Sequence, residues 1–341
     1  MFCALLLWEM LLGMGAYRVS RHQHPVLGLI RGQGNLFQFD EGLCWTHRNS
    51  LGFRGEEPRA KLPGEYRIAL IGNSYVEGMQ LIDKETLSAQ LTQQLASRGF
   101  PRGCSAINCG INGAQPAEYI QFAKFYRSVF QPDYVVVQLY QQDFTYNMFN
   151  KNATWYIKKN GNNYVVAKSN QTDMEYIEKV TAKCPSALRW IFLSATATTF
   201  AKKYSSSLME ALNSMHNTLH QPAQVNNVSY ANEFVPASAV DWTIDQLQKS
   251  YPKLIILYIP NIDYFTHAAP HPVEAMLQQA CAAHAVDYLN MRDVFEASYT
   301  RTHIPAHGFN NTMPGTGHTN AHGDRLIAEQ LAYYFAGKIH R

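Results

Sequence analysis

Three short apolar runs without polar alternation constrain the fold of this chain more than any other feature of its sequence. They are Arg67–Ile71, Ser105–Cys109 and Tyr134–Leu139. Continuous apolar character over so few residues is typical of strands that are covered on both faces. Helical spacing of apolar residues fills the stretches between them, over Glu85–Arg98 and Pro116–Phe130. Strand and helix therefore alternate, which predicts an α/β fold with a parallel sheet and helices on both faces.

The same alternation returns near the C-terminus after an irregular stretch. Strands are expected over Lys253–Tyr258 and Val286–Leu289, with helices over Ala239–Tyr251, Pro272–His284 and Ala321–Lys338. The irregular stretch, about residues 147–235, begins with a hairpin over Trp155–Ala167 that turns at Asn160-Gly161, since Asn-Gly supplies the positive φ angles of such turns. Helical patterns follow it. We interpret residues 147–235 as an insertion or lid of hairpin plus helices in one α/β domain.

The N-terminal part of the chain lacks the alternation of strands and helices that the rest of the sequence shows. Its first seventeen residues are apolar except for Glu9, and as a helix they would be roughly 25 Å long, close to the thickness of a bilayer core. We expect residues 1–24 to be a hydrophobic anchor or signal remnant, with membrane association through residues 1–17; the alternative is an amphipathic or buried helix. We expect the rest of the chain to face the periplasm or exterior. Arg18 and Arg21 follow the apolar run, however, and by the positive-inside rule they favour the opposite orientation. Residues 25–63 lack a sustained period and are interpreted as a lead-in segment.

Composition excludes several classes of protein. The chain has 341 residues, of which 46% are hydrophobic and 16% charged, which excludes a disordered or collagen-like chain. Its formal charge is +3 and its Lys and Arg residues are scattered, so no nucleic-acid partner is expected. Two histidine pairs have a spacing seen in metal sites, but neither has a third ligand or an H-E-x-x-H motif beside it, and no metal or other cofactor is expected. The pairs are His303 with His307 and His318 with His322.

Unusual polar residues follow the predicted strands at the edge of the sheet where ligands bind in such folds. Gly72-Asn73-Ser74 follows the first strand, Asn108 to Gly113 (NCGING) the second, and Gln141-Gln142-Asp143 the third. Gly315 to Asn320 (GTGHTN) precedes the last helix. A serine, a histidine, glycine N–H groups and a side-chain amide are the components of an acyl-transfer site. Taken alone, each motif is weak evidence for such a site; a serine after a strand, for example, is usually only a helix N-cap.

In their order and spacing these motifs resemble the SGNH (GDSL) hydrolase family. The resemblance begins at Asn49 to Gly55 (NSLGFRG), which is similar to a lead-in of membrane-anchored bacterial members, and extends to the final helix. It implies a flavodoxin-like three-layer sandwich over residues 64–341. It also implies Ser74 as nucleophile, His318 as base, and an oxyanion hole formed by the N–H groups of Ser74 and Gly113 and the amide of Gln142.

The sequence departs from this family's pattern at three positions. Asn73 replaces the aspartate of the G-D-S motif, and Gln142 stands where the family has asparagine. More seriously, the carboxylate expected two or three residues before His318 is missing, because Gly315 and Thr316 occupy those places. We therefore expect a Ser-His dyad with an orienting group still to be found, for which the candidates are Thr316, Gly315 and Asp263.

The resemblance predicts a serine esterase that hydrolyses O-acyl esters, with O-acetyl first, through an acyl-enzyme. The expected substrate is an acylated carbohydrate or a small ester or lipid, and the expected location is the cell envelope, either anchored and facing the periplasm or exterior, or secreted. A second hypothesis is a catalytically impaired domain of this type that binds a glycan or an envelope partner. An α/β-hydrolase is disfavoured because Val76 replaces the second glycine of G-x-S-x-G, and a Rossmann site because G-x-G-x-x-G is absent after the first strand.

Overall fold

A single parallel sheet organises the molecule. The computed structural model describes residues 21–24, 26–31, 33–38, 41–100, 103–149, 154–161, 163–169, 234–261, 264, 269–313 and 315–339. Within these ranges a 5-stranded sheet has the order β11-β10-β7-β5-β6. Its strands are β5 (Arg67–Gly72), β6 (Ser105–Gly110), β7 (Tyr134–Leu139), β10 (Leu254–Tyr258) and β11 (Asp287–Asn290), all paired in parallel. The chain enters the sheet at an inner strand, β5, adds β6 on one side of it and then crosses to β7 on the other side. This order is the flavodoxin-like one and places a topological switch point between β5 and β7.

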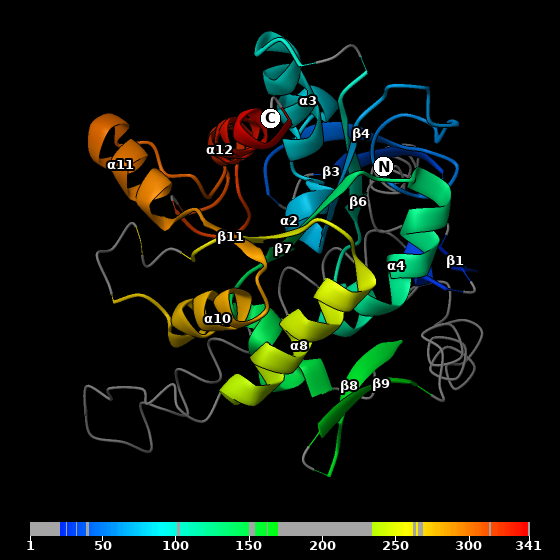
Figure 1. Ribbon diagram of the computed structural model, residues 1–341. Helices are drawn as coiled ribbons and strands as arrows, with labels where there is room; N and C mark the ends of the chain where they lie inside the picture. Colours follow the sequence, from blue (N-terminus) through cyan, green and yellow to red (C-terminus); the bar gives the residue numbers. More distant parts are fainter. Residues whose placement is uncertain are drawn as a thin grey trace, which may run out of the picture.

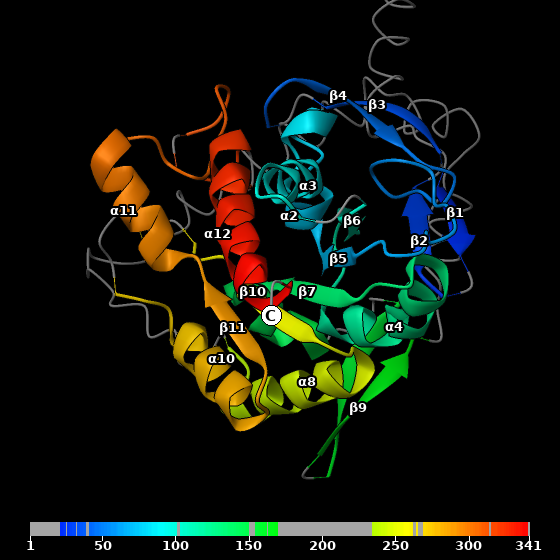
Figure 2. The ribbon, with the colours of Figure 1, turned by 45° about the horizontal axis from the view of Figure 1, so that its top comes forward.

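Helices cover both faces of this sheet and make it a three-layer sandwich (Figures 1 and 2). One face is covered by α3 (Leu87–Ser97), α11 (Arg292–Thr302) and α12 (Ala321–Ile339), and the other by α4 (Pro116–Phe130), α8 (Ala237–Ser250) and α10 (Pro272–Ala283). Alternate residues of each central strand enter different cores: Ile68 and Leu70 pack with α3 and α12, whereas Ala69 and Ile71 pack with α4. The predicted α/β fold is confirmed.

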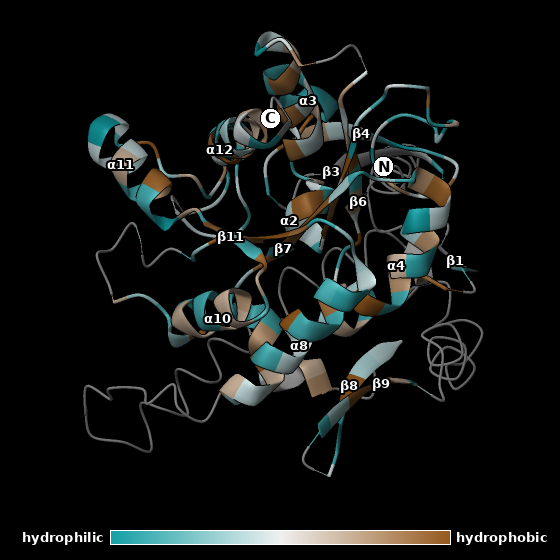
Figure 3. Cartoon of the chain, viewed as in Figure 1, coloured by the Kyte–Doolittle hydropathy of each residue, from teal (hydrophilic) through white to brown (hydrophobic). Residues whose placement is uncertain are grey.

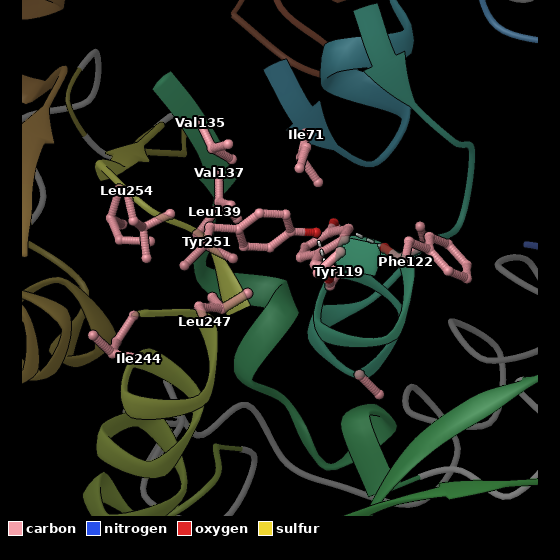
Figure 4. Packing of buried hydrophobic residues seen from close by; sticks show 14 of the residues in the cluster. Ile71, Tyr119, Phe122, Val135, Val137, Leu139, Ile244, Leu247, Tyr251 and Leu254 are labelled. Carbon is pink, nitrogen blue, oxygen red and sulfur yellow. Dashed lines mark hydrogen bonds between the residues drawn. The ribbon is translucent and has the colours of Figure 1, made fainter. Parts of the chain in front are cut away.

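The continuous apolar runs are explained by this double coverage. Every residue of β10 is buried, as is every residue of β5, and the central strands are among the most hydrophobic parts of the ribbon in Figure 3. Figure 4 shows Val135, Val137 and Leu139 of β7 facing Tyr251, whose hydroxyl donates a hydrogen bond to the backbone oxygen of Tyr119 in α4. A polar side chain would have no water on either face of such a strand.

The predicted elements agree closely with the observed ones. The expected strands differ from β5, β6, β7, β10 and β11 by no more than a residue at each end, and Pro116–Phe130 matches α4 at both ends. The predicted hairpin is present as β8 (Trp155–Asn160) and β9 (Asn163–Lys168), with Gly161 at φ 61° in its turn. Helix α11 was not expected. The helical patterns predicted beyond the hairpin, within residues 170–233, lie outside the described residues.

Four strands that the sequence did not indicate lie in the lead-in segment and at the end of the predicted anchor segment, residues 1–24. Strand β1 (Arg21–His24) pairs with β2 (Gly28–Arg31), and β3 (Gly34–Gln38) with β4 (Cys44–Arg48), both antiparallel and outside the main sheet. In both ribbon views β3 and β4 lie near α2 (Ser74–Glu77) and α3 (Figures 1 and 2). Among the described helices, none has the length and apolar character needed to span a membrane. The anchor predicted for residues 1–17 falls outside the described ranges.

Candidate active site

Ser74 is the first residue of α2, at the carboxyl end of β5. The Asn73 Oδ1 atom caps this short helix by accepting a hydrogen bond from the Tyr75 N–H at 3.0 Å. Two glycines allow the helix to lie directly on the strand ends. A Cβ at Gly72 would come within 2.5 Å of Val76 Cγ2, and one at Gly110 within 2.2 Å of the Glu77 nitrogen. The glycines of both predicted motifs are therefore required by the packing that presents Ser74.

Asn108, in the second motif, holds the same helix from the side. Its Nδ2 donates to the Val76 carbonyl at 2.7 Å, and its Oδ1 accepts from the Gly110 N–H at 3.0 Å. The side chain is buried, at 3% exposure, so it does not reach solvent or substrate. The asparagine that the motif places here thus joins the end of β6 to α2.

His318 meets Ser74 as the sequence predicts. Its Nε2 lies 2.7 Å from Ser74 Oγ, within hydrogen-bond distance. The loop that carries His318 is fixed by pairing with the preceding segment: Gly308 N–H donates to the His318 carbonyl at 3.1 Å, and Gly315 N–H to the His307 carbonyl at 3.1 Å. The two residues are separated by 244 positions in the chain and are brought together by the fold.

The acidic partner of His318 is Glu41, which the sequence analysis missed. Its Oε2 lies 2.5 Å from His318 Nδ1. Gly317 leaves space for this carboxylate, since a Cβ at that position would come within 2.5 Å of Glu41 Oε1. Glu41 lies 277 residues before the histidine, in the lead-in segment. No sequence signal marked it beyond its closeness to the lead-in motif at residues 49–55.

This contact corrects two of the three candidates proposed as orienting groups, Thr316 and Gly315. The Thr316 hydroxyl donates to the Met313 carbonyl at 2.7 Å. Within the described residues, no hydrogen bond joins His318 Nδ1 to this hydroxyl or to the backbone carbonyl of Gly315, because Glu41 Oε2 lies at that nitrogen. Asp263 lies outside the described residues. Glu41 was not among the candidates, because it lies in the lead-in segment, before the first strand of the sheet.

Several contacts dock the Glu41 segment on the residues that follow Ser74. Arg48 forms a buried ion pair with Glu77, the last residue of α2. The Cys44 thiol donates to the Met79 carbonyl at 2.8 Å. Arg54, the arginine of the lead-in motif, donates to the Gly78 carbonyl. The lead-in motif therefore has a structural reason, because it joins the segment carrying Glu41 to the helix carrying Ser74.

The same segment is also fixed on the histidine side. The Gly42 N–H donates to Asn311 Oδ1 at 2.7 Å, and the Asn311 amide donates to the Gly42 carbonyl at 3.4 Å. Glu41 thus lies between two anchored neighbours, α2 on one side and the loop before His318 on the other. Its side chain and that of His318 are 23% and 24% exposed, so the pair is only partly screened by water.

This arrangement selects one form of the imidazole. A carboxylate only accepts hydrogen bonds, so Glu41 requires a hydrogen on His318 Nδ1. The other nitrogen, Nε2, then presents a lone pair to the Ser74 hydroxyl. A histidine held in this form removes the serine proton when the hydroxyl attacks a carbonyl group, and the carboxylate stabilises the imidazolium that results.

The oxyanion-hole candidates surround the same strand ends. The N–H groups of Ser74 and Gly113 donate no hydrogen bond to another group of the described residues. Gly113 is exposed, has φ +78°, and a Cβ built there meets nothing within 4 Å. Gln142 is exposed, its Oε1 accepts from the Tyr140 hydroxyl at 3.2 Å, and no hydrogen bond links it to Ser74 or His318 within the described part of the chain. Two backbone donors and one amide are thus free for a ligand.

Asn73 has a physical reason to differ from the aspartate of the G-D-S motif. Burial raises the pKa of the neighbouring Asp143 carboxyl well above its usual range, although the Tyr140 N–H donates a hydrogen bond to its Oδ2 at 3.0 Å and the Asn73 side chain also favours the carboxylate. An asparagine can donate such a bond and cap α2 with its oxygen at the same time. An aspartate at position 73 would instead place a second carboxyl group beside a buried one.

The other histidines singled out in the sequence have different surroundings. His322 contacts the Ser298 hydroxyl through Nε2 at 3.0 Å, but Arg325 donates to its Nδ1 at 3.0 Å. The hydrogen of neutral His322 is therefore on Nε2, and this serine is not activated. His307 is fully buried, with its Nδ1 3.2 Å from the Tyr264 hydroxyl, and burial lowers its pKa to about 3.

Comparisons with known proteins give distant likenesses only. No protein-family model and no curated protein matches this sequence. Among solved structures, the chain is similar to a lipase/acylhydrolase from Enterococcus faecalis, with 11% identity and a TM-score of 0.42 over 80% of this chain and 96% of that one. It is also similar to the acetyl xylan esterase AlAXEase (13% identity, TM-score 0.39, 79% and 98% covered) and to AlinE4, an SGNH-hydrolase family esterase (13%, 0.36, 81% and 98%). The chemistry assigned to this chain therefore rests on the contacts of its own residues.

Proposed function

We propose that this protein is a serine esterase that hydrolyses O-acyl esters through an acyl-enzyme. The observation that carries the proposal is the unbroken series of contacts from Ser74 Oγ to His318 and from His318 to Glu41 Oε2, at 2.7 and 2.5 Å. The hypothesis of a catalytically impaired binding domain rested mainly on a missing acid. A carboxylate at His318 Nδ1 removes that reason.

The reaction follows from the geometry in two steps. His318 Nε2 takes the proton of Ser74 as Oγ attacks the ester carbonyl, and the N–H groups of Ser74 and Gly113, with Gln142, stabilise the oxyanion. The alcohol leaves with the proton held by His318, which yields the acyl-enzyme. A water molecule then gives its proton to His318 and attacks the acyl carbonyl, releasing the acid and restoring Ser74.

The substrate class that we propose is an O-acetyl or other short O-acyl ester, on a carbohydrate in the first instance. The motif resemblance supports it, and so do two half-buried rings near the nucleophile. Tyr75 directly follows Ser74, and its ring centroid lies 5.1 Å from that of Tyr140 and 4.8 Å from that of His318. Aromatic faces beside polar groups are typical linings of small-molecule sites. Small esters and lipids remain substrates to compare in the same assays.

Three variants test the proposed triad. Ser74→Ala and His318→Ala should each remove nearly all turnover of p-nitrophenyl acetate, and the double variant should be little worse, because the residues act as one unit. Glu41→Ala should lower kcat/KM by about 10²- to 10⁴-fold, as expected when the imidazole loses its orienting carboxylate. A fluorophosphonate probe should label Ser74 alone.

The matched control for the acid is Glu57→Ala, since Glu57 belongs to the same segment but binds Ser50 and Gln33 instead of His318. This variant should keep its turnover within about twofold of wild type, a smaller change than the loss of even one weak hydrogen bond would cause. Turnover by Ser74→Ala at the wild-type rate, or no labelling of a folded wild-type protein, would contradict the esterase proposal.

We also propose a cell-envelope location, with residues 1–24 as anchor or signal. The support is the apolar run of residues 1–17 in the sequence. In cell fractionation, the full chain should sediment with membranes or be exported, and a chain starting at Arg21 should remain in the cytoplasmic fraction. Equal amounts of both chains in the cytoplasmic fraction would contradict the proposal.

A further inference from the structure

Gln80 occupies a position at His318 that the proposed mechanism does not use. Its Nε2 lies 3.1 Å from His318 Nδ1, the nitrogen that also faces Glu41 Oε2 at 2.5 Å. The residue is 9% exposed, and its Oε1 is a buried atom without a hydrogen-bond partner among the described residues. Two side chains of different chemistry therefore meet at one imidazole nitrogen.

The two neighbours favour opposite forms of the neutral imidazole. Glu41 accepts a hydrogen bond and so requires hydrogen on Nδ1, whereas Gln80 turns the NH₂ end of its amide to Nδ1 and in this orientation requires the Nδ1 lone pair. With hydrogen on Nδ1, the lone pair of Nε2 faces Ser74. With the lone pair on Nδ1, the hydrogen lies on Nε2 and points at Ser74 Oγ, and the histidine cannot take the serine proton.

The backbone around Gln80 belongs to the docking surface for the lead-in segment. A Cβ at Gly42 would lie 3.0 Å from the Gln80 carbonyl, so the residue next to Glu41 packs directly on Gln80. The carbonyls of Gly78 and Met79 accept hydrogen bonds from Arg54 and Cys44. Gln80 lies close to α2 in the chain and so stays beside His318, whereas Glu41 contacts His318 only when the lead-in segment is docked.

We propose that Gln80 is a positioning residue that holds His318 in its inactive tautomer whenever the Glu41 carboxylate is missing from Nδ1. The inference rests on the proposed function, because it concerns the base of the same reaction. Glu41 accordingly does more than stabilise an imidazolium: its carboxylate competes with the Gln80 amide for His318 Nδ1 and prevails. Loss of Glu41 leaves a site that is held in the wrong form by a hydrogen bond, and removing that bond restores part of the activity.

The test compares variants in the Glu41→Ala background by kcat/KM on p-nitrophenyl acetate. Adding Gln80→Leu should raise kcat/KM roughly fivefold over Glu41→Ala alone, the change expected for loss of one neutral hydrogen bond. Adding Gln80→Glu should raise it by about tenfold or more, because a carboxylate then accepts from Nδ1. The matched control is Gln93→Leu, an exposed residue of α3, which should leave the Glu41→Ala value unchanged.

A second readout separates tautomer control from a merely structural role. In ¹⁵N NMR of histidine-labelled protein, His318 of the Glu41→Ala variant should show hydrogen on Nε2, and this preference should weaken when Gln80→Leu is added. The Gln80→Glu variant keeps a polar side chain at the buried position, so it also tests the inference if the leucine variant does not fold. An active wild type whose double variants remain at the Glu41→Ala rate, with unchanged His318 signals, overturns the role of Gln80 alone. A folded wild type without turnover or probe labelling overturns the esterase proposal instead.

Discussion

Asp324 is a buried carboxyl whose ionisation affects the stability of the folded chain near neutral pH. Burial raises its pKa to about 7, although the Thr319 hydroxyl donates to its Oδ1 at 2.7 Å. The Leu87 N–H and the charge of Arg54 also favour the carboxylate, but burial outweighs them. A carboxyl whose pKa is higher in the folded than in the unfolded state binds protons more tightly when folded. Its effect on stability is therefore absent below the unfolded pKa near 3.9, and becomes fully unfavourable as pH rises through about 7.

Replacing this carboxyl removes the pH-dependent loss. We expect Asp324→Asn to gain stability relative to wild type between pH 5 and pH 8, by roughly 2–3 kcal/mol, because one pKa unit corresponds to about 1.4 kcal/mol. Urea unfolding at the two pH values measures the change. The exposed Asp293 is the control, since Asp293→Asn should show the same difference from wild type at both pH values. A stability difference for Asp324→Asn that does not vary with pH would contradict the assignment.

The candidate site could be predicted residue by residue only where the chain carries local patterns. Ser74 and His318 lie in short motifs beside regular elements, so their meeting follows from the topology of a parallel sheet. Glu41 lies in a segment without periodicity, and its contact with His318 spans 277 residues. Nothing in the sequence determines which distant carboxylate fills the space beside Gly317, because that depends on how two loops and α2 pack together.

Among the elements, strands were predicted better than the parts that lie outside the sheet. The strands of the sheet are buried on both faces, and their composition shows this directly. Helix α11 was missed because its buried residues include Arg292 and Ser298, which do not form an apolar stripe. Strands β1 to β4 were missed because short hairpins outside the main sheet need no alternating pattern. Tertiary contacts, instead of local preference, decide their structure.

The buried ion pair between β4 and α2 lets us estimate how much stability is lost when one of its two charges is removed. Arg48 and Glu77 are 2% and 1% exposed, so removing one charge leaves the other buried. We expect Arg48→Met to lower the free energy of unfolding by about 3–5 kcal/mol, and Arg48→Met/Glu77→Leu to regain most of it. Urea unfolding gives both values. In the single variant kcat/KM should also fall, because the segment that carries Glu41 is held less firmly.

The exposed Arg98 supplies a control for the loss of an arginine. Arg98→Met should change stability by less than about 0.5 kcal/mol, as is usual for surface positions. If the double variant at positions 48 and 77 were as unstable as Arg48→Met, the loss would come from the missing Arg48 hydrogen bond to the Gly52 carbonyl and not from the unpaired Glu77.

At the scale of the whole molecule, the sequence predicts the architecture and the structure adds how its parts depend on one another. The sheet, its two helical layers and the position of the site at the strand ends follow from the order of apolar runs. The role of the lead-in segment does not, because it comes from contacts with α2 and with the loop before His318. The lead-in segment before the α/β domain supplies Glu41, one of the three groups of the proposed triad.

The long separation between Glu41 and His318 also has a consequence for folding. Contacts far apart in the chain close large loops and are slow to form, whereas the α/β units between them involve nearer neighbours. The triad joins a residue before the first sheet strand to a residue just before the last helix. Completion of the proposed triad is therefore a late step of folding: the sheet can assemble before Glu41 reaches His318, and under the proposed function a partly folded intermediate would carry no esterase activity.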